Sequence, residues 1–345
     1  MRARRLTAAM LAALLLGAAG LCVWLLLWRP AADARRLAEH VQPVEAEVAA
    51  GIDTLSVTWF GVTAVLIRHG DDALMIDPFF TRPPGYWPLV QNASIAPDEA
   101  RIAQWLARAG IDRLHAVLVS HSHYDHAMDA GVVARRTGAV LAGSPSTLQI
   151  GRGAGLAAAQ LRDASDGAAL SLGPFFVRFI ESRHAGATGG APTGEIDAPL
   201  RPPARYLDYR QGGTYSILVE HRLGSVLHHG SAGYVAGALD AVRADTVLLG
   251  AALVGDAEAY VRAVVDPLEA REVVLTHWDD FTRPLDEPLR PMPIAVNLKP
   301  LLDALARRPA LRVRTPVLAQ PFAVVPARKP PSTPTTAPAD RSGSR

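Results

Sequence analysis

The sequence predicts a layered α/β domain with mixed sheets, placed behind an apolar N-terminal helix. Three features support this: two stretches of short β-type runs, helical spacing after the strands of each stretch, and a long apolar segment near the N-terminus. The short early runs favour mixed sheets over a single parallel sheet. With 345 residues, 49% of them hydrophobic, the chain can form one large core or two smaller ones.

An apolar run from about Leu6 to Trp28 follows three arginines near the N-terminus. Its length of roughly 22 residues is enough to cross a bilayer as a helix, whereas the apolar region of a signal peptide has about 7 to 15 residues. Trp24 and Trp28 lie where an interfacial aromatic belt is expected. We therefore expect residues 1–30 to be an uncleaved membrane anchor, with a cleaved signal sequence as the alternative.

The charges around this run favour a cytoplasmic N-terminus, with the following domain on the extracytoplasmic side. After signal cleavage the domain would instead be secreted or periplasmic. The remaining sequence divides into three parts by composition: a polar juxtamembrane helix or linker at 31–52, a globular domain at 53–325, and a disordered Pro-, Ser-, Thr- and Arg-rich tail at 326–345.

Charge and cysteine content exclude some classes of function. The net charge is +2 and the arginines are scattered, so the concentrated basic face of a nucleic-acid binder is not expected. The single cysteine, Cys22, lies in the apolar run, which rules out an intramolecular disulfide and a cysteine-based zinc site. A metal would have to be held by histidine and carboxylate side chains. The oligomeric state is not predicted.

The first half of the domain begins with an antiparallel meander that ends at Asp77-Pro78. A Pro-rich loop at 82–88 precedes a helix at 97–109, in which Ile102, Trp105 and Leu106 share one face. A buried strand at 116–120 leads directly into a histidine cluster. The other expected elements are strands at 55–60, 64–68, 73–76 and 139–141, and a helix at 127–137.

The second half repeats the alternation of strands and helices. A strand at 175–180 leads to Arg183-His184, and the Gly-, Pro- and Ala-rich segment 185–213 is interpreted as a long loop on the substrate side. Further strands are expected at 215–219, 225–227, 246–249 and 273–275, with helices at 257–265 and 299–306.

The histidine cluster is His121-Ser-His-Tyr-Asp-His126, at the end of a predicted buried strand. His121 and His123 are two residues apart in an extended segment, so their side chains project to one face and can bind one ion together. Asp125 and His126 lie on the turn into a helix, close enough to face a second ion. Imidazole and carboxylate ligands suit Zn, Fe and Mn.

His-x-His-x-Asp-His after a buried strand resembles the signature of the metallo-β-lactamase superfamily, and the similarity extends from about Leu55 to Phe281. The motifs Trp59-Phe-Gly61, Met75-Ile-Asp-Pro78 and Thr276-His-Trp-Asp-Asp-Phe281 are most similar to the branch that includes ascorbate-6-phosphate lactonase and N-acyl-phosphatidylethanolamine phospholipase D. This resemblance implies a four-layer αββα sandwich.

The resemblance also implies two sets of metal ligands. His121, His123 and His184 would bind the first metal, and Asp125, His126 and His277 the second. His184 and His277 each follow an apolar strand, from which a side chain can reach the same edge of the sandwich. The implied metal is Zn²⁺, as one or two ions, with Mn²⁺ or Fe²⁺ as alternatives.

One position departs from the family pattern. The superfamily usually supplies an Asp that bridges both metals, and Ser231 occupies that place here, within Gly230-Ser-Ala-Gly233. A hydroxyl does not neutralise the charge between two close dications, so one metal, two metals with another bridge, or an inactive site all remain open. Candidate substitutes for the bridge are His228, His229, Asp279 and Asp280.

Three further residues are candidates for a place in the site. Asp77 matches a family position at the end of the third strand, and we interpret it as structural, a carboxylate that fixes the turn. Tyr124 and Trp278 flank expected ligands and either line the pocket or pack.

The function implied is metal-dependent hydrolysis of an ester, lactone, amide or phosphodiester, with Asp125 as the catalytic residue and no further cofactor. The substrate would be a small molecule or a lipid. A membrane-associated, phospholipase D-like phosphodiesterase is one alternative. A catalytically degenerate, membrane-tethered binding protein is an alternative of another class.

Overall fold

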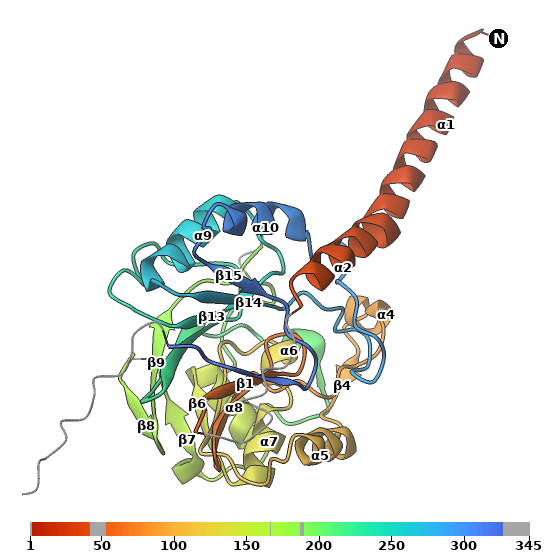
Figure 1. Cartoon of the computed structure of the whole chain (residues 1–345). Helices are drawn as coiled ribbons and strands as arrows, with labels where there is room; N and C mark the ends of the chain where they lie inside the picture. The colour runs from red at the N-terminus through yellow and green to blue at the C-terminus, as the bar shows by residue number, and fades with distance from the viewer. Residues whose placement is uncertain (1, 42–52, 166, 187–189, 327–345) are drawn as a thin grey trace, which may run out of the picture.

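Two seven-stranded sheets form the centre of the domain in the computed structural model, which describes residues 2–41, 53–165, 167–186 and 190–326 (Figure 1). The strand order is β16-β1-β2-β3-β5-β6-β7 in the first sheet and β15-β14-β13-β12-β11-β9-β8 in the second. Each sheet has an antiparallel half and a parallel half, which confirms the expected mixed sheets.

The first sheet consists of β1 (Ser56–Trp59), β2 (Val65–His69), β3 (Asp72–Ile76), β5 (Ala116–Leu118), β6 (Val140–Gly143), β7 (Leu161–Asp163) and β16 (Pro321–Ala323). The second consists of β8 (Leu170–Leu172), β9 (Phe175–Glu181), β11 (Tyr215–His221), β12 (Gly224–His229), β13 (Thr246–Gly250), β14 (Glu272–Thr276) and β15 (Arg312–Arg314). A short pair, β4 (Ser94–Ile95) and β10 (Ala204–Arg205), lies apart from both.

Helices cover the outer face of each sheet. α9 (Ala257–Val264) and α10 (Leu298–Ala306) lie over the second sheet, and α5 (Glu99–Arg108), α7 (Ala130–Thr137) and α8 (Pro145–Gly153) cover the first (Figure 1). α5 buries Ile102, Trp105 and Leu106, the face that the sequence predicts. The result is the layer order helix, sheet, sheet, helix that the resemblance implies.

The central strands explain why the sheets lie inside the molecule. β5, β13 and β14 are buried along their whole length. β5 is Ala-Val-Leu, and the three central residues of β13 and β14 are Val or Leu, so both faces of these strands are apolar. Strands of this kind need a layer on each side, which the second sheet and the helices provide.

The N-terminal helix continues past the end of the apolar run. α1 (Arg2–Val23) and α2 (Arg29–Glu39) are joined by a π-helical turn at Trp24–Trp28, and α1 projects away from the domain (Figure 1). Pro30 is tolerated in the first turn of α2, because a π turn already interrupts the regular hydrogen-bond ladder there.

α2 packs on the domain through Leu37 and Asp33, both buried, next to α10. The expected segment 31–52 is therefore helical in its first part, while its residues 42–52 and the expected tail from residue 327 lie outside the described residues. The described helix is long and apolar enough to cross a membrane, and a signal sequence would pass the same test.

Several short elements differ from the expected ones. The Pro-rich loop at 82–88 gives way to α4 (Tyr86–Val90), which begins after Gly85 in a positive-φ conformation. The helix expected at 127–137 is divided into α6 (Tyr124–Ala127) and α7. α8, β7, β8, β15 and β16 were not anticipated, because three-residue strands and a Gly-containing helix give little periodic signal.

Candidate metal centre

The ends of several strands meet at one edge of the sandwich. β3 and β5 are parallel neighbours, as are β12, β13 and β14, and β9 has the same direction as β12 because both are antiparallel to β11. Asp77, His121, His184, Ser231 and His277 each follow the carboxyl end of one of these strands. The fold thus gathers residues that are far apart in the sequence.

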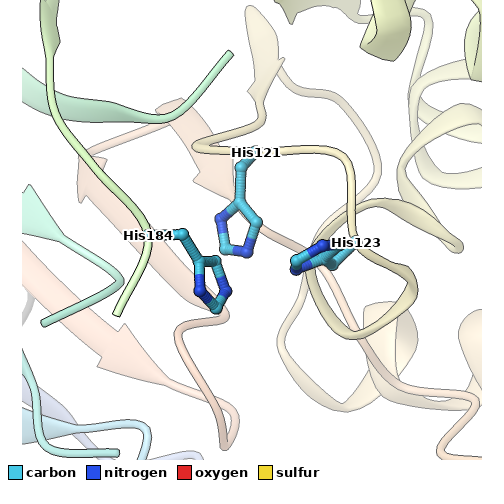
Figure 2. A group of neighbouring side chains, drawn as sticks. All are labelled: His121, His123 and His184. Carbon is cyan, nitrogen blue, oxygen red and sulfur yellow. The ribbon is translucent and has the colours of Figure 1, made fainter. Parts of the chain in front are cut away.

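The first group of side chains contains three imidazoles, those of His121, His123 and His184. One ligand atom from each lies within 4.8 Å of the others. The three ring centroids are separated by 4.9, 4.9 and 4.8 Å, and Figure 2 shows the rings around a common centre. This nearly equilateral arrangement suits a single ion bound by three nitrogen ligands.

In each of these rings one nitrogen is already engaged by the protein. Nδ1 of His121 lies 3.2 Å from the Ser120 hydroxyl, Nε2 of His123 lies 3.2 Å from the Pro192 carbonyl, and Nδ1 of His184 lies 2.7 Å from the Ala185 carbonyl. Such contacts fix the ring and its tautomer. The other nitrogen of each ring remains for a metal, and Nε2 of His121 is buried with no partner among the described residues.

The second group contains Asp125, His126 and His277, and its ligand atoms also lie within 4.8 Å of one another. Oδ2 of Asp125 is 3.5 Å from Nε2 of His126 and 3.6 Å from Nε2 of His277. His277 has φ of +53°, and its backbone N–H donates to the Val62 carbonyl at 2.6 Å. The two groups adjoin, with the rings of His121 and His126 centred 3.9 Å apart.

A buried carboxylate, Asp77, holds the second group in place. It accepts hydrogen bonds from the Ser120 backbone N–H at 2.7 Å, the Ser120 hydroxyl at 2.6 Å and the Thr63 hydroxyl at 2.9 Å. Nδ1 of His126 lies 2.9 Å from the same carboxylate. The expected structural role is therefore present, but it includes orienting His126 as well as fixing the turn. Nothing in the sequence identified Thr63 or Ser120 as its partners.

The ionisation of the cluster favours metal binding. Burial lowers the pKa of four imidazoles, to about 4 for His123 and His277, and in the same direction for His121 and His184. At neutral pH these rings have a lone pair without having to release a proton. Burial acts the same way on His126, but the carboxylates of Asp125 and Asp77 outweigh it and raise its pKa.

Asp125 is ionised at neutral pH. Burial would raise its pKa, but the neighbouring His126, His277 and His123 lower it below its ordinary value. The cluster therefore combines four neutral imidazoles, the imidazole of His126 and a carboxylate, a donor set that fits Zn²⁺, Fe²⁺ or Mn²⁺.

Ser231, at the place of the expected bridging carboxylate, lies on the wall of the same cavity. Its hydroxyl oxygen accepts a hydrogen bond from the Ala185 backbone N–H at 2.8 Å. Ser231 therefore positions the residue that follows His184, and it places no negative charge between the two groups.

Neither histidine that was considered as a substitute for the bridge belongs to the two groups. Nε2 of His228 lies 3.1 Å from the Thr63 carbonyl, and Nδ1 of His229 lies 2.7 Å from the Ser216 hydroxyl. The two residues are neighbours on β12, so their rings lie on opposite faces of the second sheet. The ring of His228 faces the Asp77 carboxylate at 3.7 Å, and the ring of His229 faces Tyr260 on α9.

The two carboxylates considered as substitutes are also engaged elsewhere. Asp280 accepts hydrogen bonds from Thr282 and Arg290. Asp279 accepts the Val62 backbone N–H at 2.8 Å and pairs with the fully buried Arg82. Because the Val62 carbonyl accepts the His277 backbone N–H, the contact between Asp279 and Val62 helps to fix the backbone at His277. No feature of the sequence pointed to Arg82 as the partner of Asp279.

A cavity of about 320 Å³ opens beside both groups. Tyr124 lines it, whereas Trp278 packs against Trp59 with ring centroids 5.2 Å apart. The remaining wall is mostly apolar, including Leu89, Tyr206, Leu207, Phe281 and Met292.

Comparison with known proteins agrees with this geometry. Residues 57–271 match the family model described as the metallo-beta-lactamase superfamily. A UPF0173 metal-dependent hydrolase of Rhizobium meliloti is 31% identical over 134 residues, which cover 39% of this chain and 49% of that protein. The chain spans about half the length of the curated relatives it matches.

Two solved structures are similar to this chain over most of its length. A metallo hydrolase from the archaeon Ignicoccus hospitalis has a TM-score of 0.48 at 16% identity, covering 78% of this chain and 98% of that one. CmlA, a diiron beta-hydroxylase from Streptomyces venezuelae, has a TM-score of 0.48 at 16% identity, covering 82% and 55%. The narrower resemblance to the lactonase and phospholipase branch is supported by its sequence motifs alone.

Replacing Asp77 by Asn tests its role in orienting His126. The amide keeps the shape but loses the charge, and we expect about a 10- to 100-fold loss of metal affinity in the second group, with a smaller effect on the first. Calorimetric titration with Zn²⁺ measures the metal affinity of each group. The matched control is Asp129→Asn, a buried carboxylate bonded to Phe80 and Thr81 outside both groups, which should leave the metal affinities unchanged. Equal metal affinities in the wild type and Asp77→Asn would contradict this role.

The lowered pKa of His123 predicts a pH effect on the metal-free protein. Between an unfolded pKa of about 6.5 and a folded pKa of about 4, the unfolded chain takes up a proton here that the folded chain does not, so the free energy of unfolding falls as the pH falls. From pH 7 to 5 this site should account for about 2 kcal/mol. Denaturant unfolding should show that the free energy of unfolding of His123→Gln falls less than that of the wild type between pH 7 and 5. An identical fall in the two proteins would contradict the lowered pKa of His123.

Proposed function

The chain belongs to the metallo-beta-lactamase superfamily, and on that premise we propose that it is a metal-dependent hydrolase whose metals are bound by His121, His123 and His184 and by Asp125, His126 and His277. The observation that supports this most strongly is the convergence of six ligand side chains in two adjoining groups, each within 4.8 Å. A pseudoenzyme would more often have lost several of them.

Zn²⁺ is our first choice of metal, with Mn²⁺ and Fe²⁺ as alternatives, because imidazole and carboxylate ligands suit all three. A metal bound here would lower the pKa of water and polarise a carbonyl or phosphoryl oxygen. The three-histidine group fills first in this proposal, since its rings are neutral. The second group fills less tightly, because no carboxylate at position 231 neutralises the charge between two ions.

Asp125 has the catalytic role in the proposal. Its ionised carboxylate orients the attacking water and accepts a proton from it when one metal is present, and acts as a ligand when two are present. The apolar cavity wall excludes bulk water and holds the substrate against the two groups.

The reaction is hydrolysis of an ester, lactone or amide. A phospholipase D-like phosphodiesterase acting at a membrane is the second candidate, favoured by the long apolar N-terminal helix and the apolar cavity wall. In either case we propose that this helix is a membrane anchor with the domain on the extracytoplasmic side. A tethered binding protein without catalysis is the outcome if the metal-loaded protein hydrolyses nothing.

Metal removal tests the proposed activity. Chelation should abolish hydrolysis of generic esters and phosphodiesters by the full chain in detergent, and added Zn²⁺ should restore it. Because loss of an outer residue that only orients a ligand costs about 10- to 100-fold, His121→Ala and His277→Ala should each cost at least about 100-fold. His69→Ala, a surface histidine paired with Asp53, is the control. Unimpaired hydrolysis in both ligand variants would refute the site.

Replacing Ser231 by Asp tests the metal count. A carboxylate between the groups should increase the affinity of the second group for its ion. With two equivalents of metal added per chain, the ratio of bound metal to protein should therefore rise from near one toward two. Ser231→Asn, similar in size but neutral, should remain near one. If the wild type already holds two ions equally tightly and the Asp variant changes nothing, the proposed order of filling is wrong.

A further inference from the structure

The cavity beside the two ligand groups has a second chamber. The inner chamber is the cavity of about 320 Å³ lined by Leu89, Tyr206, Leu207, Phe281 and Met292. The outer chamber has a volume of about 660 Å³ and includes Tyr234, Asp256, Tyr260 and Asn297 in its wall. Both chambers are of the size of small-molecule sites.

The two chambers meet at the first ligand group. His184, Ala185, Leu253 and Ala295 line both. A substrate whose reacting atom lies at His184 can therefore extend one arm into each chamber. The inner arm would contact apolar side chains. The outer arm would meet the apolar side chains of Val254 and Ile294 as well as hydroxyl, amide and carboxylate groups.

Leu253 stands at the boundary between the chambers. It has φ of +56°, a conformation that costs free energy for any residue with a β-carbon, and its backbone N–H donates to the Ala295 carbonyl at 2.8 Å. The side chain is 47% exposed, so burial in the core does not offset that cost. Its Cδ1 lies 3.4 Å from where a β-carbon on Gly186 would be. The strained backbone thus presents a large apolar side chain at the point where the chambers meet.

The charge of the chamber walls restricts the substrate. Among the described residues, no lysine or arginine lines either chamber, although the chain has 35 of them. The ionisable side chains that do line the chambers, besides histidine and tyrosine, are the carboxylates of Asp125 and Asp256. An anionic group at the far end of either arm, away from the proposed metals, would be desolvated without a cationic partner, which is costly.

From these observations we propose that the substrate is a two-armed ester or amide without an anionic group, with its apolar acyl arm in the inner chamber and an uncharged alcohol or amine arm in the outer one. Leu253 limits the width of the outer arm at the boundary. This inference rests on the proposed hydrolase function.

The reaction is a simple hydrolysis. The oxygen of water bonds to the carbonyl carbon, and the bond from that carbon to the ester oxygen or amide nitrogen breaks. One proton of the water goes to the leaving oxygen or nitrogen, and the products are the carboxylic acid and the alcohol or amine. No oxidant or co-reactant is needed.

Matched esters test the charge restriction with the metal-loaded full chain in detergent. The hexanoyl ester of 1,6-hexanediol and the hexanoyl ester of 6-hydroxyhexanoic acid share the acyl arm and differ in charge at the far end of the alcohol arm, away from the ligand groups. We expect kcat/KM for the charged ester to be lower by about tenfold or more. Equal values would overturn the charge restriction. If neither ester is hydrolysed while the metal-loaded protein hydrolyses a phosphodiester, this inference fails and the proposed function stands. If the metal-loaded protein hydrolyses nothing, both fail.

Leu253→Gly tests the boundary. Glycine adopts a positive φ without strain, so this variant should fold and keep the wild-type metal content. We expect the ratio of kcat/KM for benzyl hexanoate to that for ethyl hexanoate to rise by about tenfold. Phe176→Ala removes another exposed apolar side chain, on β9 and away from both chambers, and should leave the ratio unchanged. An unchanged ratio in Leu253→Gly with intact hydrolysis would refute the role of Leu253 and leave the proposed function standing.

Discussion

The arrangement of the site depends on one buried carboxylate. Asp77 is fully buried, and an ionised carboxylate in such a place is unfavourable unless it is paired and hydrogen-bonded. Ser120 and Thr63 donate to it, Nδ1 of His126 lies 2.9 Å from it, and Nε2 of His228 lies 3.7 Å from it. These contacts join the end of β3, the end of β5 and the first turn of α6. The orientation of His126 therefore depends on the formation of the first sheet.

The electrostatics of the cluster follow from the same burial. Most of its imidazoles are neutral because a buried positive charge is costly, while His126, between two carboxylates, is held by them. The first group therefore needs little change in protonation to accept a cation. The second group has the only carboxylate among the six proposed ligands, and Ser231 adds none. This asymmetry explains why the two groups should differ in metal affinity.

Much of the fold and of the candidate site could be predicted from the sequence, because the relevant patterns lie within short segments of the chain. The meander of β1 to β3 and the helix α5 have clear periodicity, and His121, His123, Asp125 and His126 lie within one short motif. His184 is expected from the family resemblance and from its place after an apolar strand, and in the structure that strand ends at the same edge.

The remaining features depend on contacts between distant segments. Thr63 and Ser120 become partners of Asp77 only when the sheet is formed, and the pairing of Arg82 with Asp279 joins residues 197 positions apart. The continuation of the N-terminal helix past Pro30 depends on a π turn and on packing of α2 against the domain. Neither the π turn nor the packing of α2 is indicated by a pattern in the sequence.

Anomalous X-ray scattering at the zinc edge, from crystals of the protein grown with Zn²⁺, tests the central claim most directly. We expect a strong peak at the centre of His121, His123 and His184, and a weaker one within reach of Asp125, His126 and His277. Zinc bound elsewhere, or a peak at the second group with none at the first, would contradict it.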